Sequence, residues 1–204
     1  AGVRVLDELE IDRTALGPRV PIEGLRVRCG DDVGEHHVGR DEEPLGWVVE
    51  RRAFDGALVE QVRARGVAVF SDHKLVRLER DCRGHTLWFE TGSERVETIC
   101  AQLLVGADGT GSAVRRLHGF GEPAPRARAV VAETAPTAAD GLWSGAGGII
   151  EFDLSIVREG VPGYAWHFAS CQGGRSVVSR GVYVAPATAT PPAKLLTQVL
   201  KARG

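Results

Sequence analysis

Hydrophobic residues in the first third of the chain switch between a helical period and a period of two. Charged residues interrupt the apolar positions between Val3 and Ile11 at helical spacing, which predicts a helix there. Arginines alternate with apolar residues from Gly24 to Cys29 and predict a short strand, and Trp47–Val49 predicts a second. Apolar residues return at helical spacing over Arg52–Arg65, so we expect an amphipathic helix that Gly66 ends.

The middle of the chain contains short apolar runs and one long alternating segment. Val67–Phe70 and Leu103–Val105 are fully apolar and predict buried strands. Between them, alternation from Leu75 to Glu97 predicts antiparallel strands joined by tight turns. A short helix is expected over Val114–Leu117. This order favours an α/β domain with an inserted antiparallel ribbon over residues 1–120.

Long strands dominate the remainder of the chain. Period-two patterns predict strands at Gly148–Leu154, Gly163–Ala169 and Arg175–Val184, and apolar residues after Pro192 predict a final helix. We therefore expect an α+β second part, residues 121–204, built on an antiparallel sheet.

Composition narrows the functional classes. The chain of 204 residues is 43% apolar and 25% charged, which is typical of a globular protein. The net charge of −2 and the scattered basic residues exclude an extended nucleic-acid surface. No apolar run approaches the ~20 residues of a membrane-spanning helix. The four cysteines form no CxxC pair, so we expect no metal site, reduced thiols and a cytoplasmic location.

The turn after the apolar run at 103–105 is the strongest candidate for chemistry. Gly106-Ala107-Asp108-Gly109 leads from a predicted strand into a predicted helix. Glycines allow backbone N–H groups to approach a pyrophosphate, and a carboxylate there can accept hydrogen bonds from sugar hydroxyls. The alternative is a tight turn without a ligand.

This turn resembles a known fingerprint. The pattern D-G-x-x-S-x-V-R, from Asp108 to Arg115, is similar to the second flavin motif of the p-hydroxybenzoate-hydroxylase-like flavoproteins, which include aromatic hydroxylases and geranylgeranyl reductases. The resemblance implies a Rossmann-like FAD-binding domain, with Asp108 on the ribityl chain. It also implies a set of cofactor-binding residues in this turn: Gly106, Ala107, Asp108, Gly109, Ser112 and Arg115.

Two upstream positions extend the resemblance. Residues 49–55 resemble the family's V-x-R-x-x-F-D, whose arginine is Arg51 here and would lie near the FAD phosphates. Arg52 is its neighbour and competitor, and a solvated helix terminus is the alternative for both. In the family, backbone groups around Leu75 would face the adenine edge.

A third pattern concerns the substrate. Tyr164-x-Trp166-x-Phe168 resembles the Y-x-W-x-F-P motif of the geranylgeranyl-reductase-like branch, with Ala169 where the proline is expected. These three aromatic side chains share one face of a strand and would line a pocket for an apolar substrate. The alternative is that they form the core face of the sheet.

These patterns lead us to expect an FAD-dependent oxidoreductase with a small hydrophobic substrate and NAD(P)H as a candidate electron donor. Isoprenoid reduction and monooxygenation both stay open, as does peripheral membrane contact, and no residue stands out as a catalytic acid or base. The chain contains no Met and starts within a helical pattern at Ala1, so we expect an internal fragment. It would lack the family's first βαβ unit, with G-x-G-x-x-G, and the later G-D-A motif. A noncatalytic remnant or binding module is the alternative.

Overall fold

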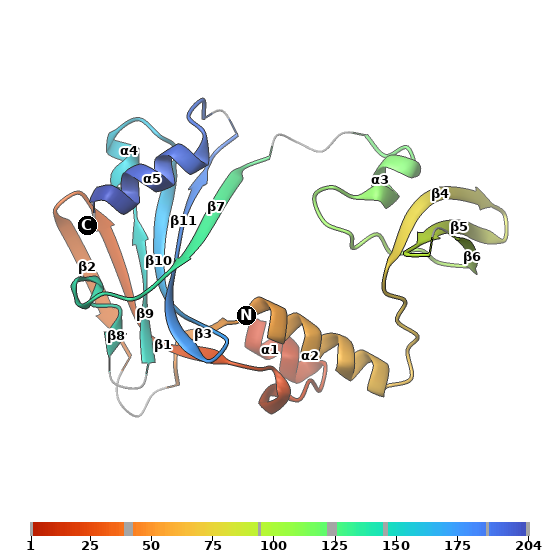
Figure 1. Cartoon of the computed structure of the whole chain (residues 1–204), viewed down its shortest axis with the longest axis horizontal. Coiled ribbons are helices and arrows are strands. Elements are labelled where there is room, and N and C mark those ends of the chain that lie inside the picture. The colour runs from red at the N-terminus through yellow and green to blue at the C-terminus, as the bar shows by residue number, and fades with distance from the viewer. Residues whose placement is uncertain are drawn as a thin grey trace. The chain divides into compact units, whose positions relative to one another are not determined.

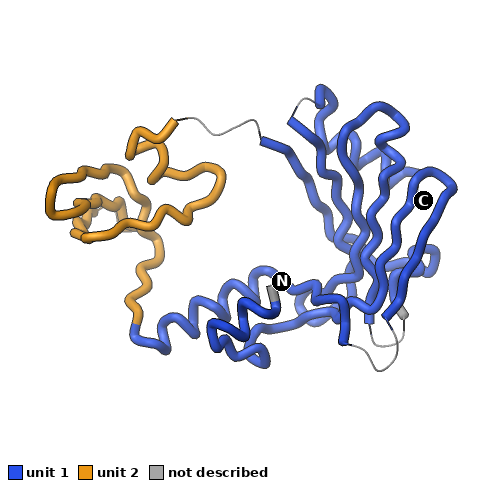
Figure 2. The backbone as a smooth tube through the Cα atoms, turned by 180° about the vertical axis from the view of Figure 1, so that it is seen from behind, with its two compact units in different colours: residues 1–66, 125–204 blue, residues 67–124 orange. Residues whose placement is uncertain are grey.

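The computed structural model describes residues 2–38, 43–93, 95–121, 126–144, 147–186 and 188–202. The chain forms two compact units, shown in Figure 2. The first contains residues 1–66 and 125–204, and the second contains residues 67–124. The predicted division of function at residue 120 stays a prediction. The first unit is discontinuous because a strand from the N-terminal part pairs with a strand beyond residue 146.

An eight-stranded mixed sheet forms the first unit (Figure 1). Its main order is β2-β1-β9-β10-β11-β7, and β3 and β8 add to β1 and β9. Only the β1–β9 pair is parallel among the pairs of described strands. The strands are β1 (Arg19–Cys29), β2 (Asp32–His37), β3 (Gly46–Val49), β7 (Arg128–Thr134), β8 (Trp143–Ser144), β9 (Gly147–Asp153), β10 (Gly163–Gln172) and β11 (Arg175–Val184).

Three of the helices that accompany this sheet lie where the hydrophobic period predicts them, whereas η1, η2 and α4 were not predicted. Both predicted N-terminal helices and the predicted C-terminal helix are present, and β1 begins five residues earlier than the strand expected from Gly24. No described helix is long and apolar enough to cross a membrane. The helical elements of this unit are α1 (Gly2–Glu8), η1 (Arg13–Ala15), α2 (Arg51–Ala64), η2 (Ala138–Asp140), α4 (Ser155–Arg158) and α5 (Pro192–Ala202).

One face of the sheet carries the hydrophobic core. Strand β10 alternates, so Ala165, His167 and Ala169 lie on this face and are fully buried. Helices α4 and α5 contribute Ile156 and Leu195 to one core cluster around Ala165. A second cluster surrounds Ala169 and includes residues of β1, β9 and β11. The opposite face of β10 therefore carries its aromatic residues.

The second unit contains a three-stranded antiparallel sheet and one short helix. Its elements are β4 (His73–Asp81), β5 (Gly84–Thr91), β6 (Val96–Ala101) and α3 (Ala113–Leu117). The order β4-β5-β6 confirms the ribbon predicted from the alternating segment.

Two predicted strands of this unit are wrong. Val67–Phe70 and Leu103–Val105 have no regular secondary structure, and Leu103 and Val105 are 79% and 75% exposed. An apolar run becomes a strand only when a neighbouring strand supplies hydrogen-bond partners. Within the described part of the second unit, the three strands pair only with one another.

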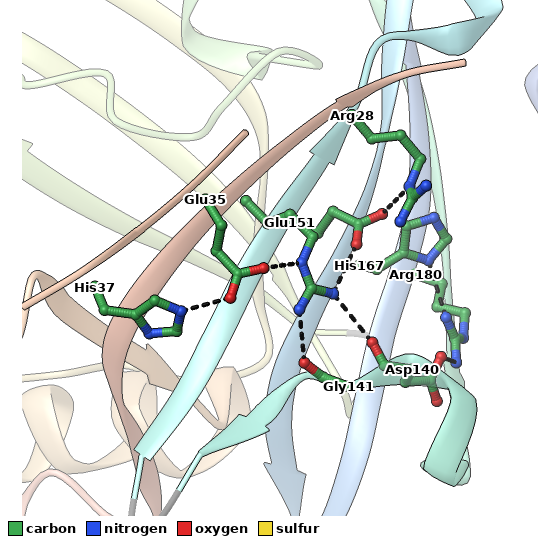
Figure 3. A network of polar contacts seen from close by, with 9 residues as sticks. Arg28, Glu35, His37, Asp140, Gly141, Glu151, His167 and Arg180 are labelled. Atoms are coloured by element: carbon green, nitrogen blue, oxygen red, sulfur yellow. Dashed lines mark hydrogen bonds and ion pairs between the residues drawn. The ribbon is translucent and has the colours of Figure 1, made fainter. Parts of the chain in front are cut away.

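A row of charged and polar residues crosses the core face of the large sheet (Figure 3). Arg26, Glu151, His167 and Arg180 lie side by side on β1, β9, β10 and β11. Arg26 Nη1 lies 3.2 Å from Glu151 Oε2, and Arg180 Nη1 lies 3.0 Å from His167 Nδ1. Glu151 and His167 are fully buried, so each depends on these partners in place of bulk solvent. We call these four residues the buried row.

The buried row also holds the segment that follows β7. Arg180 Nη2 donates to Asp140 Oδ1 at 2.5 Å, and Arg26 Nη2 donates to the Gly141 carbonyl at 2.9 Å. Burial alone would raise the pKa of Asp140, but hydrogen bonds from Arg180 and Thr137 keep that pKa below its ordinary value. Asp140 therefore stays ionised opposite Arg180 and fixes η2 over the sheet.

His167 is neutral within this row. Burial, together with the positive charge of Arg180, lowers its pKa from 6.5 to about 4. A proton on the imidazole would place another cation between Arg180 and the rest of the buried row.

We predict that the free energy of unfolding falls as the pH is lowered from 6.5 towards 4. In this window the unfolded chain protonates His167 and the folded chain does not, so acid favours unfolding. The shift corresponds to about 3 kcal/mol at full effect, at about 1.4 kcal/mol per pKa unit. Urea unfolding at a series of pH values measures this slope in the wild type and in His167→Gln. An equally steep slope in the variant would contradict the assignment to His167.

Candidate functional site

The predicted flavin turn lies in the second unit, where its carboxylate caps a helix. Asp108 Oδ2 accepts hydrogen bonds from the backbone N–H groups of Ala113 and Val114, at 2.6 and 3.1 Å. Asp108 Oδ1 accepts from the Ser112 hydroxyl at 2.5 Å, and Ser112 Oγ accepts from the Arg115 N–H at 2.9 Å. The Ser112 hydroxyl and the Val114 N–H lower the pKa of Asp108, so its carboxylate is charged at neutral pH.

Two glycines of the turn, Gly106 and Gly109, are required for different structural reasons. A Cβ on Gly106 would lie 3.0 Å from Val114 Cγ1, so Gly106 allows α3 to pack against the turn. Gly109 has φ +76°, a left-handed conformation that glycine adopts without strain, and a Cβ there would meet nothing within 4 Å. The backbone at Gly109 is therefore open to a ligand. A charged carboxylate beside an open glycine backbone fits the sugar and phosphate groups of a dinucleotide.

A pocket of about 350 Å³ lies beside this turn within the second unit. It brings together Gly106, Ser112 and Arg115 of the predicted set, whereas Ala107, Asp108 and Gly109 do not line it. The Arg115 side chain donates to the Gly121 carbonyl at 3.1 Å. Sequence reasoning missed the other lining residues, which come from β4, β5, α3 and the segments before and after α3: Arg80, His85, Leu104, Val114, His118 and Phe120.

The two upstream candidates lie in different units. Leu75 is half-buried in β4, where it pairs with Phe89 beside an irregularity in the strand register. Arg51 is the first residue of α2 in the first unit, and its side chain is 79% exposed. Arg51 Nη2 lies 3.0 Å from Asp55 Oδ2, one helical turn away. The cofactor roles predicted for Leu75 and Arg51 stay predictions.

The predicted substrate residues form part of a larger aromatic surface on the first unit. Tyr164, Trp166 and Phe168 are half-buried on the side of β10 opposite the core. Phe152 on β9 lies 5.5 Å from Tyr164 and 5.2 Å from Phe168, and Tyr183 on β11 stacks on Tyr164 at 5.2 Å, between ring centroids. We call these five residues the aromatic face. Sequence periodicity identified only the three members on β10. Phe152 and Tyr183 lie on neighbouring strands, and only the pairing register of those strands places them on the same face.

Glycine in the neighbouring strand allows one ring to lie flat on the sheet. A Cβ on Gly181 of β11 would overlap the Trp166 indole, so only glycine fits beneath this side chain. Gly181 pairs directly with Trp166 in the register of β10 and β11. The aromatic face is thus built into the backbone of the sheet, and it can hold an apolar planar molecule by ring contacts.

Residues 3–146 match the family model described as FAD binding domain. The ubiquinone hydroxylase UbiL of Rhodospirillum rubrum is 30% identical over 121 residues, which are 58% of this chain and 27% of that protein.

Two solved flavoprotein structures share the fold of this chain. A flavoprotein/dehydrogenase from Cytophaga hutchinsonii has a TM-score of 0.71 at 17% identity, over 99% of this chain and 50% of that one. The flavin-dependent monooxygenase PieE, solved in complex with FAD and substrate, has a TM-score of 0.55 at 18% identity, over 92% of this chain and 34% of that one. The expected α/β fold class is confirmed, and the structure realises it as a mixed sheet and a separate antiparallel sheet. The chain spans half the length of these relatives or less.

Proposed function

The chain belongs to the FAD binding domain family, and on that premise we propose that the protein is an FAD-dependent monooxygenase acting on an apolar organic substrate. The cofactor is FAD. Among the relatives, the ubiquinone hydroxylase and the monooxygenase PieE support oxygen insertion as the reaction.

The Asp108 turn is the proposed contact with FAD. Its carboxylate would accept hydrogen bonds from the ribityl hydroxyls, and the open backbone at Gly109 would approach the pyrophosphate. The Arg51 guanidinium would add a positive charge near the phosphates, because its pairing with Asp55 is exposed and readily exchanged. Leu75 would offer backbone groups to the adenine.

The single observation that carries the substrate assignment is the aromatic face. Five rings spread over β9, β10 and β11 stay half-exposed on the side of the sheet away from α4 and α5. Such a surface binds a flat apolar molecule, orients it by stacking and excludes water from one side of it.

The overall reaction balances with a nicotinamide as reductant. One C–H bond of the substrate becomes C–OH, one O₂ is consumed, NAD(P)H is oxidised to NAD(P)⁺, and the second oxygen atom leaves as water with one proton taken up. Bound FAD supplies the electron transfer between the nicotinamide and oxygen. The residues of this chain bind and orient, and no catalytic acid or base is assigned.

Reduction of an isoprenoid double bond is the second candidate. The observation that favours it is the Tyr164-x-Trp166-x-Phe168 pattern, which resembles the geranylgeranyl-reductase-like branch. This reaction uses the same cofactor and surface and consumes no oxygen.

We predict that Asp108→Ala weakens FAD binding by the whole protein about tenfold, equivalent to about 1.4 kcal/mol. The variant loses a charged acceptor of hydrogen bonds next to the open backbone. Asp81→Ala is the matched control, because Asp81 is another exposed carboxylate of the second unit that accepts a backbone N–H. Flavin absorbance after dialysis, and FAD titration followed by fluorescence quenching, measure the affinity. Equal retention of FAD by both variants would rule out the Asp108 assignment, and a wild type that binds no flavin would support a noncatalytic remnant.

We predict that the whole protein incorporates one atom of ¹⁸O₂ into its substrate for each NAD(P)H oxidised productively. A short-chain ubiquinone analogue is the first test compound, chosen from the relative that hydroxylates ubiquinone. Mass spectrometry of the product and an oxygen electrode measure the two quantities. Saturation of an isoprenoid double bond of the test compound, seen after reoxidation of any quinol, under nitrogen and without oxygen uptake, would instead establish the reductase.

A further inference from the structure

The buried row contains one hydrogen-bond donor that has no acceptor. His167 is fully buried, and its Nε2 makes no hydrogen bond to any described part of the chain. Buried polar atoms of folded proteins nearly always have a partner, either from the protein or from an ordered water molecule. This nitrogen therefore indicates a small ligand inside the layer between sheet and helices.

The contact with Arg180 decides which ring nitrogen carries the proton. Arg180 Nη1 lies 3.0 Å from His167 Nδ1, and a guanidinium can only donate. Nδ1 must therefore be the acceptor and carries no hydrogen. Since the imidazole needs a proton on one nitrogen, Nε2 carries it and is a donor.

Two carboxylates lie on the other side of the ring. Glu151 and Asp153 come from β9, whereas Arg180 comes from β11, and β10 with His167 lies between them. One oxygen from each carboxylate and one ring nitrogen of His167 lie within 4.8 Å of one another. Nδ1 is already occupied by Arg180, so Nε2 is the nitrogen that faces a shared ligand.

A cluster of one histidine and two carboxylates would ordinarily suggest a divalent metal ion. The tautomer excludes that ligand here, because a protonated Nε2 has no lone pair to give to a metal. The surroundings also disfavour a cation, since Arg26 Nη1 and Arg28 Nε lie 3.2 and 3.4 Å from the oxygens of Glu151.

Only a ligand that both accepts and donates fits these three groups. An anion would meet two carboxylates, and an ammonium ion has no lone pair for the Nε2 proton. Water accepts one hydrogen bond from Nε2 and donates its two hydrogens to Glu151 and Asp153. Because the three atoms lie within 4.8 Å of one another, a point no more than about 2.8 Å from each lies between them, within reach of ordinary hydrogen bonds.

We propose that Glu151, Asp153 and His167 hold one ordered water molecule as an integral part of the sheet, and that the cluster is not a metal site. A pocket of about 540 Å³ between α4, α5 and the end of β1 gives this water a route to solvent. Asp153 belongs to both the cluster and the pocket lining, together with Arg28, Ile156 and Leu195. The water completes the hydrogen bonding of the buried row while adding no charge to it.

The test uses the unmodified chain, labelled with ¹⁵N, at neutral pH. Histidine-optimised NMR correlation spectra should place the proton of His167 on Nε2, with Nδ1 at the shift of an unprotonated ring nitrogen. Water-selective exchange spectroscopy should show a cross-peak between that proton and a long-lived water molecule. A proton on Nδ1, or an Nε2 proton without a water cross-peak, would overturn the proposal.

Metal binding is tested on the same chain after treatment with a chelator. Addition of Zn²⁺ or Mn²⁺ should shift the Tm by less than about 1 °C, because neither ion binds the folded cluster. Stoichiometric uptake of either ion with a raised Tm, lost in Asp153→Asn, would establish a metal site instead. The water cross-peak should weaken in Asp153→Asn and persist in Asp31→Asn, whose side chain lines only the pocket.

Discussion

The large sheet depends on one constraint, the pairing of charges across its buried face. Arg26, Glu151, His167 and Arg180 stand in register on four strands, and two of them have no exposed surface. Buried charges are tolerated only when each has a partner in place of water. A slip of one residue in any of these strands would turn its member of the row to the other face and leave its neighbours unpaired. The row therefore selects one register.

The same register assembles the aromatic face on the opposite side. Because side chains alternate, fixing His167 on the core face places Trp166 and Phe168 on the other. Phe152 and Tyr183 then come within ring contact of Tyr164, and Gly181 lies beneath the indole. The proposed substrate surface is thus a consequence of charge pairing behind it. The proposed FAD contact at Asp108 is built separately, in the second unit, where the Asp108 carboxylate caps a short helix beside the open backbone of Gly109.

Much of this could be predicted from local patterns, and the failures have a common cause. Helical period and alternation predicted α1, α2, α3, α5, the ribbon and the strands β9, β10 and β11, because these signals lie within one segment. The short helix α4 and the strands β2 and β7 were not predicted. The parallel pairing of β1 with β9 joins residues more than 120 positions apart, such as Ile22 and Gly148, and no local pattern carries it. For the same reason the sequence identified the aromatic residues of β10 but not their partners. The apolar runs at 67–70 and 103–105 were predicted as strands, although strand formation depends on a neighbour that periodicity does not reveal.

The pairing of charges in the buried row is tested most directly by measuring how much unfolding free energy Glu151→Gln and Glu35→Gln each lose relative to the wild type. Both glutamates pair with Arg26, but the Glu35 side chain is 31% exposed and that of Glu151 is fully buried. If the sheet depends on the buried row, Glu151→Gln should lose about 3–5 kcal/mol and Glu35→Gln less than about 1 kcal/mol. Equal and small losses in the two variants, measured by urea unfolding at pH 7, would contradict this account.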